Sequence, residues 1–266
     1  MQTKEKNKSF ISCNVDSYLD STVYNDVLKT YAKECITLLD YGFVAISSLE
    51  NSIIEPVQFT ECEISPFHLH DIPCDSTSEP SFKRAKSSFV FTQKKIKCTE
   101  LQSWLINTFS PDDEGRRPYP SAGGLYPVEP LIFLFNETVE SDSPFTSGCY
   151  HFRPVSKTLQ LIKPLSYSVF YSQLLHSLLD EKAPPAFCIL YTAHVGKAIF
   201  KYRYRGYRHA VMEAGSMYQL AAMSSQNAGL SNTVWSSFSE YELLAALDLD
   251  PGMFMPITMQ LFGYSE

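Results

Sequence analysis

The 266-residue chain lacks paired cysteines, long apolar runs and any excess of positive charge. Its 7 cysteines are scattered without a CxxC pair, which favours reduced thiols over a disulfide framework. The first residues, MQTKEKNKSFIS, contain no apolar run of signal-peptide length, and no stretch reaches the roughly 20 apolar residues of a membrane span. We therefore expect a soluble, cytoplasmic protein that does not bind membranes.

The charge balance excludes a second class of partner. The net charge is −7 and the sequence pI is about 5.4, whereas a protein that binds a nucleic acid duplex needs a basic excess to displace counterions. Charged residues make up 19% of the chain and hydrophobic residues 44%. This composition is typical of a globular protein that buries much surface, including surface between subunits.

Hydrophobic periodicity divides the chain near residue 80. A helix is predicted over 24–41 and a short strand over 43–46, followed by a proline-punctuated connector over 51–81. We interpret residues 1–80 as an N-terminal module with a connector that docks partners, and residues 81–266 as the main domain.

The main domain alternates apolar strands with helices, which predicts an α+β fold with a mixed sheet flanked by helices. Strands are expected at 130–136, 149–153, 158–162, 186–193, 234–238 and 257–263. Helices are expected at 168–180, 207–228 and 241–249.

A loop rich in proline and glycine, RRPYPSAGGLYPVEP, spans residues 116–130. Pro120 and Pro127 stiffen it, and the small residues Ala122, Gly123 and Gly124 let backbone N–H groups approach a flat or anionic ligand. It is not a phosphate loop, because the Lys-Ser/Thr ending is missing. A tight surface turn explains the same composition equally well.

The segment FKYRYRGYR at 200–208 interleaves basic and aromatic residues. If it is a strand, Lys201, Arg203 and Arg205 share one face and Tyr202 and Tyr204 the other. Crowded cations favour a neutral lysine, which could act as a base. The alternative is a solvated basic edge, but this mixture of tyrosine and arginine favours a functional patch.

Two further segments contain residues that bind ligands in other proteins. Arg84, Lys86, Ser87 and Ser88 at 81–89 could hold a phosphate, although a basic surface stretch is equally consistent with the pattern. Cysteines 62 and 74 with histidines 68 and 70 have no known zinc-site spacing. We therefore predict no metal site.

The two long motifs at 116–130 and 200–222 resemble the SagB/McbC-type dehydrogenases, the flavin subunits of azole-forming peptide synthetases and relatives of the nitroreductases. The resemblance covers about residues 82–263. It implies a nitroreductase-like homodimer with an N-terminal extension, two FMN sites at the subunit interface, and helix 207–228 packed across the dimer. The matching residues imply a catalytic pair, Lys201 and Tyr202.

The resemblance also implies the FMN ligands. The loop residues that match are Pro120, Ser121, Ala122, Gly123 and Leu125. Arg84 and Ser87 match the phosphate-binding positions, but the family's Arg-Arg-Ser-x-Arg pattern is replaced by Arg-Ala-Lys-Ser-Ser. The remaining phosphate charge must come from elsewhere, and Arg116, Arg117 and Arg208 are the candidates.

The activity implied is FMN-dependent oxidation of thiazoline and oxazoline rings to thiazoles and oxazoles on a ribosomally made precursor peptide, as in bacteriocin and microcin biosynthesis. The implied partners are a cyclodehydratase and a leader-peptide-binding subunit of a synthetase complex. Two alternatives stay open: a stand-alone NAD(P)H-dependent nitro or quinone reductase, and a non-catalytic scaffold subunit of the same complex.

Overall fold

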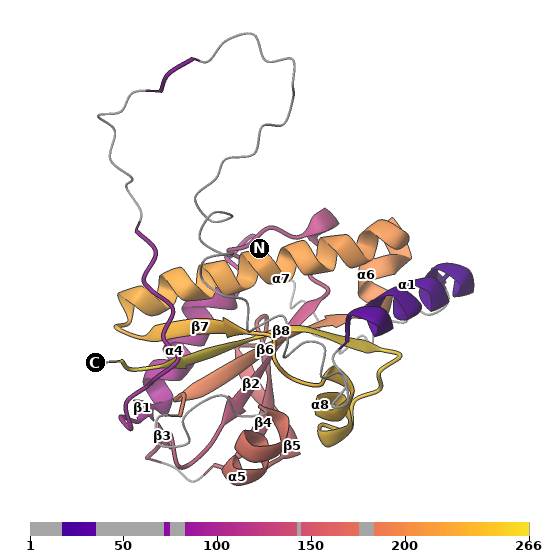
Figure 1. Ribbon diagram of the computed structural model, residues 1–266. Helices are drawn as coiled ribbons and strands as arrows, with labels where there is room; N and C mark the ends of the chain where they lie inside the picture. Colours follow the sequence, from indigo (N-terminus) through magenta and orange to yellow (C-terminus); the bar gives the residue numbers. More distant parts are fainter. Residues whose placement is uncertain (1–17, 36–71, 75–82, 143–144, 176–183, 266) are drawn as a thin grey trace, which may run out of the picture. The chain divides into compact units, whose positions relative to one another are not determined.

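The computed structural model describes residues 18–35, 72–74, 83–142, 145–175 and 184–265 (Figure 1). The chain divides into two compact units, Met1–Ile36 with Lys86–Glu266, and Thr37–Ala85. Because few residues of the second unit are described, the fold below is that of the first. The strand predicted at 43–46 and three members of the Cys/His group, at 62, 68 and 70, lie outside the described residues.

A six-stranded sheet forms the centre of the first unit, in the order β5-β4-β2-β6-β8-β7. All five pairs of neighbouring strands are antiparallel. The strands are β2 (Val128–Leu134), β4 (Gly148–Arg153), β5 (Thr158–Pro164), β6 (Phe187–His194), β7 (Ser231–Trp235) and β8 (Phe254–Gly263). Two short strands, β1 (Ile96–Lys97) and β3 (Val139–Glu140), pair in parallel beside it.

The antiparallel arrangement corrects the predicted mixed sheet. The connection from β6 to β7 runs through two helices, which is the pattern that suggested parallel neighbours. Both strands pair antiparallel with β8, which lies between them. Strands of the same direction are therefore present in the six-stranded sheet but never adjacent.

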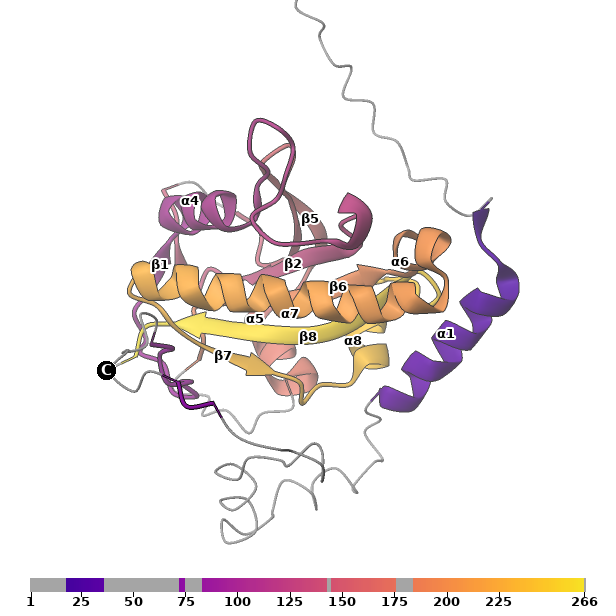
Figure 2. The ribbon, with the colours of Figure 1, turned by 90° about the horizontal axis from the view of Figure 1, so that it is seen from above.

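Alternate residues of the central strands supply two separate cores. In β2, Ile132 and Leu134 face one core and Leu131 and Phe133 the other. Helices α4 (Cys98–Phe109) and α7 (Tyr204–Asn227) cover the first face. The second face is covered by α5 (Tyr167–Val169), the π-helical turn Phe170–Leu174 that continues it, and α8 (Glu240–Ala246) (Figures 1 and 2).

Helix α1 (Ser21–Glu34) packs on the same compact unit as the sheet. Its apolar face buries Val23, Val27 and Tyr31 in the core that α4 and α7 share. The Tyr31 hydroxyl donates to the carbonyl of Pro256 at 2.8 Å. Helix α1 therefore belongs to the same compact unit as the sheet, and the boundary at residue 80 and the docking role of residues 1–80 stay predictions.

The segment 200–208 is not a strand, so that interpretation was wrong. Helix α6 (Val195–Tyr202) begins at His194, which caps it, and α7 starts two residues after α6 ends. Arg203 joins the two helices at φ 51°. A Cβ on Gly206 would lie 2.0 Å from the Ala198 carbonyl oxygen, so only glycine permits this close corner.

Most other elements agree with the sequence predictions. The strands at 130–136, 149–153, 158–162, 186–193 and 257–263 and the helices at 207–228 and 241–249 are present with shifted ends. The predicted helix at 168–180 is one turn of α-helix followed by the π-helical turn, and its last residues are not described. None of the described helices is long and apolar enough to cross a bilayer.

Candidate active site

The glycine loop and the α6–α7 corner meet within a single chain. Gly123 lies in the short 3₁₀ turn η2 (Ala122–Gly124). A Cβ placed on Gly123 would lie 2.6 Å from the Tyr202 hydroxyl oxygen and 3.0 Å from Lys201 Nζ. The turn and the lysine-tyrosine pair, about 80 residues apart in sequence, are therefore in direct contact.

The backbone of this turn suits a ligand that binds main-chain groups. Gly123 and Gly124 have φ angles of 63° and 65°, which favour glycine. The Gly124 and Leu125 amides close the turn onto the Ser121 and Ala122 carbonyls. The first N–H groups of such a turn have no partner within it. A Cβ on Gly124 would meet no atom within 4 Å, so its outer side is open.

The loop is held in shape by contacts around Tyr126, a non-glycine residue at φ 48°. Its amide donates to Ser121 Oγ at 2.9 Å. Its hydroxyl accepts from the Arg117 amide at 3.1 Å, and the Arg117 guanidinium lies 4.4 Å from the centre of its ring. Arg117 Nη1 also donates to the buried Tyr119 hydroxyl at 2.9 Å. Arg117 therefore stabilises the conformation of this loop through both tyrosines.

Two glutamates lie where the loop enters β2. Glu129 Oε1 accepts from Lys197 Nζ at 2.8 Å, and its Oε2 lies 3.1 Å from His151 Nε2. Although burial alone would raise the pKa of Glu129, the hydrogen bond from His151 and the charge of Lys197 lower it to about 2. This cluster ties α6, and with it the lysine-tyrosine pair, to the sheet.

Glu213, on α7, is 3% exposed. Its Oε1 accepts from the Val128 amide at 3.2 Å. Burial raises the pKa of Glu213 to about 7, and the Ser121 hydroxyl, the Val128 amide and the charges of Arg117 and Lys197 oppose this rise only in part.

The corner presents Lys201 and Tyr202 toward the turn and uses its other side chains to hold α1. Lys201 is exposed and Tyr202 half-buried, and the Tyr202 ring lies edge-to-face with His209 at 5.1 Å between centroids. On the α1 side, three acidic residues bind the corner. The pairs are Asp20 with Arg203 at 2.9 Å, Asp26 with Tyr204 at 3.0 Å, and Glu34 with Tyr207.

The residues predicted to bind phosphate come from several segments of the chain. Arg116 pairs with Asp112 and Glu114 of its own loop. Arg208 is exposed on α7. Ser87 is half-buried beside β7, where the next amide bonds to the carbonyl of Asn232. Arg84 belongs to the second unit and is not placed relative to the loop.

Sequence reasoning missed His209, Glu213 and the Glu129–Lys197 pair. A signal for Glu213 was available, because it lies three residues after Ala210 and four before Met217, on the same helix face. A carboxylate on a helix face predicted to be buried indicates a functional or structural role. The Glu129 cluster joins residues far apart in sequence and left no such signal.

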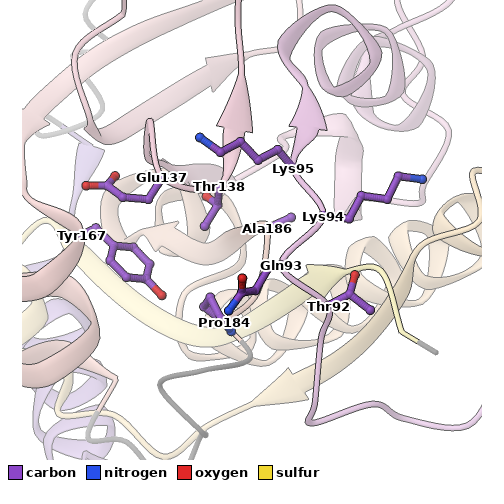
Figure 3. A pocket seen from close by; sticks show the side chains of 9 residues that line it. All are labelled: Thr92, Gln93, Lys94, Lys95, Glu137, Thr138, Tyr167, Pro184 and Ala186. Carbon is purple, nitrogen blue, oxygen red and sulfur yellow. The ribbon is translucent and has the colours of Figure 1, made fainter.

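A cavity of about 300 Å³ lies elsewhere in the described part of the chain (Figure 3). None of the predicted site residues lines it, and its Lys95 already donates to the Asn136 carbonyl at 2.8 Å. Within the described ranges, no group of three or more histidine, cysteine or acidic residues could hold a metal ion. The contact around Gly123 is therefore the better candidate site.

Comparisons with known proteins decide the family, although no family model matches the chain. The microcin B17-processing protein McbC of Escherichia coli is 33% identical over 221 residues, which cover 82% of this chain and 81% of the relative. The chain belongs to the McbC-like dehydrogenase family.

Solved structures support the McbC-like assignment and the fold. The Escherichia coli microcin synthetase McbBCD complex with truncated pro-MccB17 bound contains a chain that matches with a TM-score of 0.83 and 30% identity, covering 95% of this chain and 97% of that one. A nitroreductase-like protein from Ralstonia eutropha matches with a TM-score of 0.56 and 19% identity, over 68% and 79% of the two chains. A nitroreductase-like protein from Anabaena variabilis matches with a TM-score of 0.58 and 21% identity, over 69% of this chain and 37% of that one. These last two matches show the nitroreductase-like fold alone.

Proposed function

We propose that this chain is an FMN-dependent dehydrogenase that oxidises thiazoline and oxazoline rings to thiazoles and oxazoles on a ribosomally made precursor peptide. The observation that carries the proposal is the contact of Lys201 and Tyr202 with Gly123, in a member of the family of a microcin-processing protein. In this proposal the turn with its two adjacent glycines supplies a ligand surface, and the lysine supplies a base beside it.

The residues present fit FMN. Consecutive glycines at positive φ leave the outer side of the turn open to a flat ring. Pro120, Ser121, Ala122, Gly123 and Leu125 would contact the flavin. Arg84 and Ser87 remain the phosphate ligands that the resemblance implies, and Arg116, Arg117 and Arg208 remain the candidates for the rest of the positive charge.

Oxidation of an azoline removes one proton and one hydride from the ring. Bound FMN supplies the hydride acceptor. Lys201 Nζ takes the proton, and the Tyr202 hydroxyl orients the amine or shares the proton. His209 limits the motion of the Tyr202 ring, and the α6–α7 corner keeps both groups at the turn, where a ring held flat would present its proton.

The proposed partners follow from the same relatives. The matched chain was solved within a synthetase complex with a truncated pro-peptide bound. We propose that this chain likewise acts as a homodimer beside a cyclodehydratase and a leader-peptide-binding subunit. The two copies would complete the FMN sites at their interface.

Flavin content and reductant preference test the proposal. The purified full chain should be yellow, should release FMN on denaturation, and should be bleached only slowly by NAD(P)H. Rapid bleaching by NAD(P)H would instead favour a nitro or quinone reductase. A correctly folded chain that cannot be loaded with FMN would contradict both enzyme assignments and leave the scaffold role.

A further inference from the structure

Glu213 is a buried acidic residue that the proposed reaction does not use. Its Oε1 accepts the Val128 amide, and its Oε2 is buried without a hydrogen-bond partner among the described residues. A buried carboxylate without an ion pair destabilises a fold, so we expect such a residue to have a role that outweighs this cost. The contacts of Glu213 indicate that role.

The carboxyl group of Glu213 reaches both ends of the loop formed by residues 121–128. Val128 is the last residue of this loop and the first of β2. The hydroxyl of Ser121, the first residue, lies close enough to influence the ionisation of Glu213. Since Ser121 Oγ also accepts the Tyr126 amide, the carboxyl group supports the strained stretch as well as the two ends.

Helix α7 connects this loop to the lysine-tyrosine pair. His209 and Glu213 are four residues apart and therefore lie on the same side of the helix. The ring of His209 packs against Tyr202 at 5.1 Å between centroids, while Glu213 bonds to the loop. One rigid helix thus contacts both halves of the candidate site, and Glu213 provides the contact to the loop.

We propose that Glu213 is a positioning residue: its carboxyl group fixes the 121–128 loop on α7 so that Gly123 stays against Lys201 and Tyr202. The catalytic consequence of this inference rests on the proposed function. The structural consequence does not, because the loop and the helix belong to the protein without any ligand.

The inference includes a pH dependence with a defined sign. The charged or titratable groups around the carboxyl are Arg117 and Tyr119 from the preceding loop, Lys197 from α6, and His209 one turn earlier on α7. Burial raises the pKa of Glu213 to about 7 although the loop contacts oppose the rise. In this proposal, detachment of the loop exposes the carboxyl to water and removes that burial, so the positioned state binds the proton more tightly than the detached state. The loop is therefore held most firmly at acidic pH and loosens as the pH rises through 7.

Amide exchange of the full chain without FMN tests the structural claim. Loss of this buried hydrogen bond implies that Glu213→Ala lowers the protection of the Val128 and Tyr126 amides by about tenfold. Glu213→Gln keeps an oxygen for Val128 and should restore protection, without the change between pH 6 and pH 8 that the wild type shows. Glu140→Gln, an exposed glutamate on β3, should leave both amides unchanged.

FMN affinity tests the functional claim separately. Glu213→Ala should weaken FMN binding about tenfold, in parallel with the loss of protection, and Glu213→Gln should bind nearly as the wild type does. Protection of Val128 that is unchanged in Glu213→Ala, or lost equally in Glu213→Gln, would overturn the inference. Failure of the wild type to bind FMN would overturn the proposed function, whereas the exchange result would still decide the role of Glu213.

Discussion

Glu129 and Glu213 lie at the same end of the glycine loop, yet their surroundings have opposite effects. Glu129 has two partners, His151 and Lys197, and its pKa falls to about 2. Glu213 accepts a hydrogen bond from the Val128 amide, and burial raises its pKa to about 7. Burial raises the pKa of both groups, and it prevails at Glu213, whereas at Glu129 the partners His151 and Lys197 outweigh it.

This difference separates a fixed anchor from an adjustable one. The ion pair of Glu129 and Lys197 holds α6 on β2 throughout the neutral range, because the low pKa of Glu129 keeps its carboxylate charged there. Glu213 changes its protonation at neutral pH and holds the loop on α7. The proposed site therefore combines the proposed base, on a helix held by an ion pair, with a proposed ligand loop whose attachment to α7 is expected to depend on pH.

Breaking the fixed anchor should have the largest effect. Glu129→Ala leaves the Lys197 amine, whose side chain is 20% exposed, without its partner, and should lower the free energy of unfolding by about 3 to 5 kcal/mol. Denaturant unfolding at pH 7 measures this change in the free energy of unfolding. The double variant Glu129→Leu with Lys197→Met should recover much of the loss, and a loss below about 1 kcal/mol in the single variant would show that the pair does not anchor α6.

Neutralising the adjustable anchor should change the pH profile of stability. The folded pKa of Glu213 lies above its ordinary value of 4.5, so its contribution is complete below about pH 4.5 and declines as the pH rises through about 7. Relative to Glu213→Gln, the wild type should therefore lose up to about 3 kcal/mol between pH 4.5 and pH 8. Parallel unfolding curves across this range would contradict the assigned pKa.

The contact between the turn and the base can be probed with two neighbouring glycines. Gly123→Ala and Gly124→Ala carry the same penalty for positive φ, about 1 kcal/mol. Only the Gly123 substitution also displaces Tyr202 and Lys201, because only there would the Cβ meet other atoms. We expect FMN binding and turnover to fall further in Gly123→Ala than in Gly124→Ala. Equal losses in the two variants would mean that the contact of Gly123 with Lys201 and Tyr202 does not contribute to FMN binding or turnover.

The ion pair between α1 and the corner should have the smallest effect. Asp20 both caps α1 and binds Arg203, and asparagine caps a helix as well as aspartate does. Asp20→Asn thus removes the ion pair alone, in an exposed place where such pairs contribute little. The thermal midpoint should fall slightly at low salt and match the wild type at high salt. A large loss at both salt concentrations would assign Asp20 a greater role.

The sequence predicts the strands well because their apolar runs are continuous, as in 130–136 and 186–193, and a buried strand needs little else. The α6–α7 corner was mispredicted because alternating tyrosines and arginines imitate a strand. What fixes the helices instead is the His194 cap and the approach of Gly206 to the Ala198 carbonyl. The antiparallel order likewise depends on β8 entering between β6 and β7, which no local pattern reveals.

The residues of the candidate site likewise fall into those that the sequence revealed and those that only the structure revealed. The glycine loop and Lys201 with Tyr202 are apparent from motifs, and the structure places them in contact. His209 and the Glu129 cluster depend on which helix face meets which strand, and only the helical spacing of Glu213 from Ala210 and Met217 gave a local signal. The residues proposed to carry out chemistry were thus more visible in the sequence than those proposed to hold them in position.

Mass analysis of an azoline-containing peptide tests the central claim, that Lys201 removes the ring proton at the glycine turn. With FMN bound, the wild-type chain should remove two hydrogen atoms from each azoline ring. Lys201→Ala should keep its fold and its FMN but leave the mass of the peptide unchanged. Oxidation by Lys201→Ala at the wild-type rate would contradict the account.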